Sequence, residues 1–114
     1  MDSLTEISGT GTIFNVNITG ATSLTTLSTS IGFYNNKGYS TYQFFNCALN
    51  AASVNHLLIS LVENYTADTN GDTAGARNID LSNGTSAGTS SLTAEGLAAR
   101  DALVADNWVV TLNA

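Results

Sequence analysis

The chain has 114 residues, the size of one compact domain, and its hydrophobic fraction of 43% is that of a globular rather than a disordered protein. Nine acidic residues outnumber three basic ones, Lys37, Arg77 and Arg100, which are too few and too scattered to bind nucleic acid or an anionic membrane. Only 11% of the residues are charged, and sixteen Thr, twelve Ser and thirteen Asn supply polarity instead, which favours strands, tight turns and neutral contacts.

Residues 1–44 predict strands and an aromatic loop. The segment from Met1 to Glu6 carries neither a basic region nor an apolar run, so we expect no signal peptide. Between Ile13 and Ile18 apolar residues alternate with Asn, which predicts a half-buried strand. Residues 24–27 suit a short strand or irregular backbone, and the Asn and Gly content of residues 32–38 predicts a loop.

The next segment predicts a strand followed by a helix. Residues 42–49 are the richest strand candidate, with aromatic and apolar side chains throughout. In residues 54–62 the apolar side chains recur at helical spacing and form one stripe, made of Val54, Leu57, Leu58, Leu61 and Val62. Asn50 or Ser53 can cap the first turn of this helix.

A second strand and helix follow in the same order. After a polar loop over 64–78, residues 79–82 predict a short strand, and a second helix runs from about Thr93, which suits the N-cap, to Asp106. Its buried side is marked by three apolar residues, Leu97, Leu103 and Val104. Residues 108–112 predict a closing strand.

Strands that alternate with helices require crossover connections and therefore parallel pairing. We expect one domain over residues 1–114, with N-terminal strands and the aromatic loop in 1–44 and strand–helix units in 45–114. Its class is α/β, with one mostly parallel sheet and the helices packed on one face. The order alone fits either a small doubly wound sheet or a coil of repeats.

Two stretches favour repeats. Residues 45–61 (FNCALNAASVNHLLISL) look like a leucine-rich repeat, in which a strand and a turn precede a helix that packs Val and Leu onto the sheet. Residues 79–85 (IDLSNGT), 91–99 (SLTAEGLAA) and 103–111 (LVADNWVVT) resemble the C-terminal end of leucine-rich-repeat-like domains in bacteriophage virion proteins and bacterial surface proteins. Asn107 replaces the usual Gly before Trp108, a small departure because Asn tolerates left-handed backbone.

This resemblance covers residues 45–114 and implies a short leucine-rich-repeat-like solenoid. In such a fold Trp108 would plug the end of the core, and the last strand would finish the sheet. The opposite end, near Phe14, Val16 and Ile18, would present a free strand edge that needs covering or pairing.

We find no catalytic constellation and expect neither enzymatic activity nor a cofactor. His56, the only histidine, lies off the apolar stripe of its helix, so we expect it to face solvent rather than to serve as a metal ligand or a base. Cys47 alternates with Phe45 and Leu49 in the predicted strand, which favours a core residue over a nucleophile. The chain also lacks the G-x-S-x-G motif of a serine nucleophile.

The segment from Asp68 to Asp72 copies the first ligand positions of a calcium-binding loop. The glycine expected at the sixth position is Thr73, and the twelfth position is Ile79 in place of a bidentate acid. We therefore interpret the segment as a polar turn and keep weak calcium binding by Asp68, Asn70 and Asp72 as the alternative.

Aromatic residues in polar segments are the candidates for contact with a partner. Phe33 and Tyr34 lie in the predicted Asn- and Gly-rich loop, and Tyr39 and Tyr65 lie in or beside polar segments. Tyr supplies contact area at a small entropic cost, so an exposed loop of this kind suits protein recognition. The alternative is a loop that folds back and buries its aromatic side chains in the core.

The resemblance to leucine-rich-repeat-like domains of virion proteins implies a non-enzymatic virion structural protein of a bacteriophage, and the neutral polar composition, the acidic charge and the lack of a catalytic constellation agree with it. We expect a capsid decoration or cement protein, or a tail-associated protein, that is made in the host cytoplasm and lies on the virion exterior. Its partners would be other virion proteins and further copies of itself, with no nucleic acid and no membrane. The alternative is a receptor- or glycan-binding module of a tail fibre or a bacterial surface adhesin.

Overall fold

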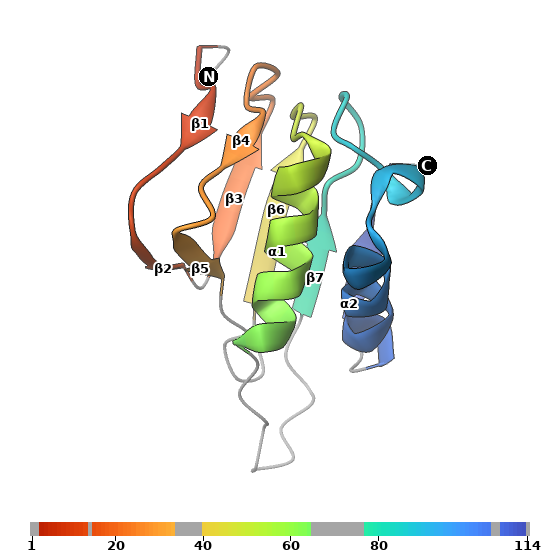
Figure 1. Cartoon of the computed structure of the whole chain (residues 1–114). Coiled ribbons are helices and arrows are strands. Elements are labelled where there is room, and N and C mark those ends of the chain that lie inside the picture. The colour runs from red at the N-terminus through yellow and green to blue at the C-terminus, as the bar shows by residue number, and fades with distance from the viewer. Residues whose placement is uncertain (1–2, 14, 34–39, 65–76, 106–107, 114) are drawn as a thin grey trace.

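A computed structural model describes residues 3–13, 15–33, 40–64, 77–105 and 108–113. Within these ranges every paired strand is parallel to its neighbour, and the two α-helices lie side by side on the same side of the largest sheet (Figure 1). The predicted α/β class with parallel strands is therefore confirmed. The expectation of one sheet is wrong in detail, because the described strands form two two-stranded sheets and one four-stranded sheet.

The N-terminal part of the chain makes two similar turns that stack on each other. The strands of the first turn are β1 (Glu6–Ile7), β2 (Gly11–Ile13) and β3 (Val16–Thr19), and those of the second are β4 (Thr26–Leu27), β5 (Ile31–Phe33) and β6 (Ser40–Phe45). Each strand of the first turn pairs in register with its counterpart in the second, β1 with β4, β2 with β5 and β3 with β6. The predicted loop over 32–38 is wrong at residues 32 and 33, which belong to β5, and its residues 34–38 lie outside the described residues.

The following two turns replace the small strands with helices. Helix α1 (Ala51–Glu63) leads to β7 (Arg77–Asp80), and a short 3-10 helix, η1 (Thr89–Ser91), precedes α2 (Ala94–Ala105) and β8 (Val109–Thr111). Strands β3, β6, β7 and β8 are neighbours in that order, so each crossover moves the chain one strand along the sheet. Both predicted helices are confirmed to within one to three residues at each end.

Helix α1 forms where the apolar stripe predicts it. Asn50 is the N-cap, and its side-chain oxygen accepts a hydrogen bond of 2.9 Å from the backbone N–H of Ser53. The stripe is buried at Val54, Leu57, Leu58 and Leu61, but Val62 is 37% exposed and lies at its margin.

Helix α2 is capped by Thr93, as predicted. The Thr93 hydroxyl accepts a hydrogen bond of 3.1 Å from the backbone N–H of Gly96. Its buried side consists of Gly96, Ala99 and Leu103. The prediction that Val104 is buried is wrong, because this side chain is 51% exposed. Small residues let α2 lie close to its neighbour, and Val104 is turned about 100° around the helix from Leu103.

The core lies between the sheet and the helices and continues between the small strands of the first two turns. Tyr42, Phe44 and Ile79 are its fully buried side chains from the sheet. Trp108 is 3% exposed and stacks on Tyr42 with 6.4 Å between ring centroids, so its predicted place in the core is confirmed. Its indole N–H has no hydrogen-bond acceptor among the described residues.

The segments that follow the large strands also stack, and Gly84 lies at their tightest contact. Beyond β6 and β7 the two segments exchange backbone hydrogen bonds, from Asn46 N–H to the Ser82 carbonyl and from Thr85 N–H to the Cys47 carbonyl. Gly84 has a φ of +59°, and a Cβ atom at this position would lie 2.3 Å from the backbone oxygen of Cys47. The corner therefore requires glycine both for its conformation and for its space.

Candidate interaction surface

Among the described residues, no group of three or more His, Cys, Asp or Glu side chains is arranged to hold a metal ion. His56 and Cys47 are the two candidate side chains for a metal ligand, a base or a nucleophile. Both are instead held in packing and hydrogen-bonding contacts within the fold. The residues of the candidate calcium loop, Asp68, Asn70 and Asp72, lie outside the described residues.

His56 is half-buried, so the prediction that it faces solvent is wrong. Its Nε2 lies 2.7 Å from the backbone oxygen of Ile31, to which it donates when Nε2 carries the ring proton. The ring also meets Phe33 edge-on, with 5.7 Å between the ring centroids. The histidine therefore attaches α1 to β5.

His56 belongs to a row of polar side chains on α1 and its C-cap residue that binds the edges of β4 and β5. We call Ser53, His56, Ser60 and Asn64 the edge-binding row. The Ser53 hydroxyl accepts from the Leu27 N–H at 2.8 Å and donates to the Thr25 carbonyl at 3.2 Å. The Ser60 hydroxyl accepts from the Phe33 N–H at 2.8 Å, and the Asn64 amide donates to the Phe33 carbonyl at 3.2 Å.

This row replaces the strand that would otherwise pair with the second turn. Buried backbone groups need hydrogen-bond partners, and a helix ordinarily offers none from its own backbone to a neighbouring strand. The four residues are spaced by three, four and four positions, the spacing of one helix face, beside the apolar stripe. That spacing is present in the sequence, but the prediction used only the apolar stripe and considered His56 separately from the neighbouring Ser and Asn residues.

A second polar contact joins α1 to α2. The buried Asn55 side-chain oxygen accepts hydrogen bonds of 3.1 Å from both the backbone N–H and the hydroxyl of Thr93. Gly96 lies directly against the same oxygen, since a Cβ atom there would be 1.8 Å from it. Asn55 thus fixes the start of α2 and requires a glycine one turn into that helix.

Cys47 is 1% exposed and lies just after β6, where the left-handed Asn46 (φ 58°) turns the chain. Its assignment to the core is confirmed. The prediction that it lies inside a strand is wrong, because β6 ends at Phe45. Burial raises the pKa of the Cys47 thiol above its ordinary value of 9.0, with a smaller lowering from a backbone hydrogen bond to Ala21. The thiol therefore stays protonated where an exposed cysteine would begin to ionise.

We expect native Cys47 to react with a thiol reagent such as DTNB at pH 8 on the order of 100-fold more slowly than in the urea-unfolded chain, because the nucleophile is the thiolate. Because the pKa is higher in the folded than in the unfolded chain, stability also declines as the pH rises above 9.0. The absorbance of the released thionitrobenzoate measures the rate. Equal rates for native and unfolded protein would contradict the burial of the thiol.

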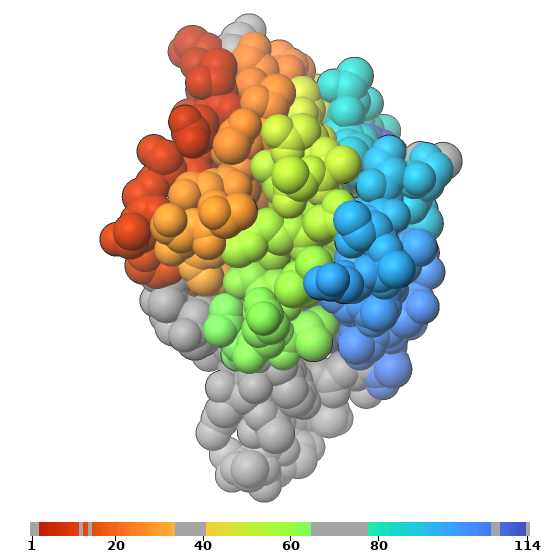
Figure 2. Space-filling view, viewed as in Figure 1, coloured from red at the N-terminus to blue at the C-terminus, as the bar shows by residue number. Residues whose placement is uncertain are grey.

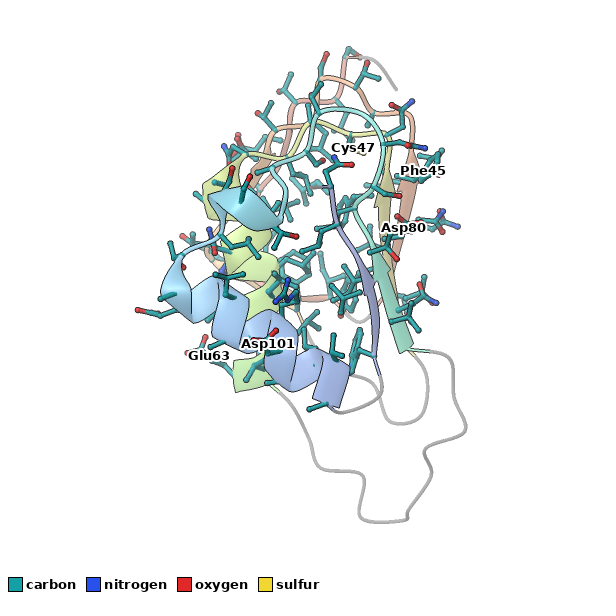
Figure 3. The ribbon with its side chains drawn as sticks, turned by 90° about the vertical axis from the view of Figure 1, so that its right-hand side faces the viewer. Phe45, Cys47, Glu63, Asp80 and Asp101 are labelled. Atoms are coloured by element: carbon teal, nitrogen blue, oxygen red, sulfur yellow. The ribbon has the colours of Figure 1, made fainter. Side chains whose placement is uncertain are left out.

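One side of the four-stranded sheet faces away from the helices and presents side chains from all four strands. We call it the outer sheet face (Figure 3 shows Phe45 and Asp80 on it, with Cys47 between the layers). Its side chains alternate along each strand with core residues, and they are Asn17, Thr19, Thr41, Gln43, Phe45, Asn78, Asp80, Val109 and Thr111.

These side chains form rows across the strands. Asn17, Gln43, Asp80 and Thr111 are successive register partners on β3, β6, β7 and β8, and Thr41, Asn78 and Val109 form the next row. Asp80 is the one charged member of the outer sheet face, and its carboxylate accepts hydrogen bonds from the backbone N–H and the hydroxyl of Ser82. Phe45 is partly exposed and Val109 is 64% exposed. The surface therefore combines neutral hydrogen-bonding groups with two apolar side chains.

Of the predicted contact residues, Phe33 is the one that falls within the described residues. Phe33 is 0% exposed and packs edge-on against Tyr42 with 5.7 Å between ring centroids, so its assignment to an exposed patch is wrong. The alternative, burial in the core, is correct for Phe33. Tyr34, Tyr39 and Tyr65 lie outside the described residues. The partly exposed aromatic residue of the outer sheet face is Phe45, which follows from its alternation with the buried Tyr42 and Phe44.

The helical side carries a shallow groove of about 260 Å³ between α1 and α2 (green and blue in Figure 2). Its lining is apolar, from Ile59, Val62, Ala98 and Ala99, with Glu63 and Glu95 also in contact with it. It contains no nucleophile or histidine, so it adds no catalytic chemistry to the described part of the chain.

No family model, no curated protein and no solved structure matches this chain. Neither helix in the described ranges is long and apolar enough to cross a membrane.

Proposed function

We propose that the protein is a non-enzymatic structural module of a bacteriophage virion, which binds another virion protein through its outer sheet face. The observation that carries this proposal is the set of in-register rows across four parallel strands. Rows of exposed side chains held by a rigid sheet give a partner a fixed pattern of hydrogen-bonding groups to match.

We further propose that the fold is a short leucine-rich-repeat-like solenoid. Four successive turns each contribute one strand to the main sheet, and contacts run chiefly between neighbouring turns. Solenoids of stacked repeats bind their partners on extended surfaces of this kind. The resemblance of residues 45–114 to such domains in virion and bacterial surface proteins supports the same assignment.

The composition of the outer sheet face favours a protein partner. The hydroxyl group of Thr41 and the amide groups of Gln43 and Asn78 can donate and accept hydrogen bonds at little desolvation cost compared with charged groups. Phe45 and Val109 supply apolar contact area beside them. This mixture is typical of protein–protein interfaces, whereas a surface for nucleic acid would need basic side chains.

Incorporation into virions tests the proposal. Mass spectrometry of purified particles of the phage that encodes the chain is expected to detect the protein. Gln43→Arg with Asn78→Arg places two charges on the outer sheet face, and we expect at least about a tenfold loss of incorporation. The matched control is Ala52→Arg, which adds a charge to an exposed position on α1. Particles without the protein, or normal incorporation of the double variant, would refute the proposal.

A second candidate is a receptor- or glycan-binding module of a tail fibre or a surface adhesin. One observation favours it: Phe45 lies two residues along β6 from Gln43, the register partner of Asp80, which places an aromatic ring close to amide and carboxylate groups. Sugars bind to such combinations by stacking and hydrogen bonding. A glycan array separates the two candidates, since a capsid-binding protein binds particles and ignores glycans, and Phe45→Ala abolishes binding only in the second case.

A further inference from the structure

The side of the first turn that faces away from the second turn carries strand edges without a partner strand among the described residues. Among the described residues, β1, β2 and β3 each have a partner on one side only, namely β4, β5 and β6. We call these three outer edges the first-turn edge (red and salmon in Figure 1). The apolar side chains next to it are only partly buried, and they are Leu4, Ile7, Ile13, Val16 and Ile18.

Two of the three strands of the first-turn edge lack the residues that usually prevent strand edges from pairing. Monomeric β proteins protect such edges with Pro or with charged side chains such as Lys. Strands β2 and β3 read GTI and VNIT and contain neither a charge nor a proline, and Glu6 in β1 is the one charged residue of the three strands. Unpaired backbone groups and incompletely buried apolar side chains at one surface indicate that this surface is covered in the assembled protein.

We propose that a second copy of the chain covers it, by edge-to-edge pairing of the two first turns around a two-fold axis. The edges of β1, β2 and β3 need hydrogen-bond partners from three other strand edges. The first turn of another copy has three such edges. A two-fold rotation reverses the strand direction, so β3 pairs with β3 of the second copy in an antiparallel ladder. Because β1 and β2 lie at opposite ends of one layer, the rotation brings β1 opposite β2 of the second copy (Figure 1).

The opposite end of the molecule cannot serve as the partner surface. Within the described ranges it offers one strand edge, that of β8, together with α2. Helix α1 satisfies the edges of β4 and β5 only through its edge-binding row, and α2 (AEGLAARDALVA) contains no Ser, Thr, Asn, Gln or His to do the same. A head-to-tail contact would leave the edges of β1 and β2 without hydrogen bonds, whereas the two-fold contact satisfies them.

This inference does not depend on the virion assignment. Its test measures the molecular mass of the purified protein, not its incorporation into virions. Sedimentation equilibrium of the purified chain is expected to give twice the monomer mass of 11.8 kDa. Asn17→Lys with Thr19→Lys places exposed like charges on both sides of the β3 pairing, and we expect the dimer dissociation constant to rise at least about 100-fold. The matched control, Val109→Lys with Thr111→Lys, adds the same charges to exposed positions on β8 and should leave the dimer intact.

Cross-linking gives a second reading that does not depend on loss of binding. Asn17→Cys and Thr19→Cys, each made separately, place a thiol on β3 close to its counterpart across the proposed axis, and at least one is expected to form a disulfide-linked dimer under mild oxidation. Val109→Cys is expected to stay monomeric under the same conditions, and the native Cys47 is buried and does not interfere. A monomeric mass at millimolar concentration, or a dimer disrupted by the β8 variant instead, would overturn the proposal.

Discussion

Replacing Gly84 with alanine is expected to lower the free energy of unfolding by roughly 3–5 kcal/mol. Its φ of +59° is unfavourable for alanine, and the added Cβ atom would lie 2.3 Å from the Cys47 oxygen and 2.8 Å from the Asn46 carbonyl carbon. Both contacts are with backbone, which cannot move aside as a flexible side chain can. The stacked corner between the second and third turns would have to open.

Gly20→Ala is the control that separates conformation from space. Gly20 also has a positive φ, +77°, but a Cβ atom there would meet nothing within 4 Å. We expect Gly20→Ala to cost about 1 kcal/mol, the conformational penalty alone. Urea unfolding followed by circular dichroism measures both variants. Equal losses for the two would show that close approach at Gly84 contributes nothing.

Replacing Ser53 and Ser60 together with alanine is expected to cost about 2–6 kcal/mol, since each change leaves a buried backbone N–H without its acceptor at about 1–3 kcal/mol. The groups left unpaired are the amides of Leu27 and Phe33, each of which donates to a serine hydroxyl at 2.8 Å. Alanine favours the helix, so helix propensity opposes the loss and cannot explain it.

Hydrogen exchange locates the effect of this double change. We expect the amides of Leu27 and Phe33 to exchange faster in the double variant, while those of β7 keep their relative protection. Ser90→Ala, at an exposed position of η1, should change the free energy of unfolding by less than about 0.5 kcal/mol. A double variant as stable as the Ser90 control would show that the edge-binding row is dispensable.

Helix α1 and the parallel pairing could be predicted from the sequence, but the prediction of one strand from Ile13 to Ile18 is wrong, because β2 ends at Ile13 and β3 begins at Val16 in another sheet. The spacing of Val54, Leu57, Leu58 and Leu61 predicts α1, and strands separated by helices predict parallel pairing, which the register of β6, β7 and β8 confirms. The small strands of the second turn could not be predicted in this way. β5 contains Gly32 and precedes an Asn-rich segment, and it is a strand because β2 lies on one side and Ser60 binds its other edge.

The candidate surface could be predicted only in part. Alternation along residues 41–45 places Phe45 opposite the buried Tyr42 and Phe44, which is a local property. The rows that join Gln43 to Asp80 and Thr111 depend on the register between strands distant in the chain, which the sequence of one strand does not specify. Phe33 shows the converse limit, because its neighbours suggest an exposed loop and tertiary contacts bury it.

The edge-binding row has a consequence for how such a chain can change in length. Helix α1 lies between the two turns that contain small strands and the turn that contains α2. It contacts the strands and α2 through different residues. Ser53, His56 and Ser60 hold the strands, whereas Asn55 holds the start of α2. Duplication of a turn on either side therefore leaves α1 unchanged, and this architecture can be lengthened in either direction while this helix is kept.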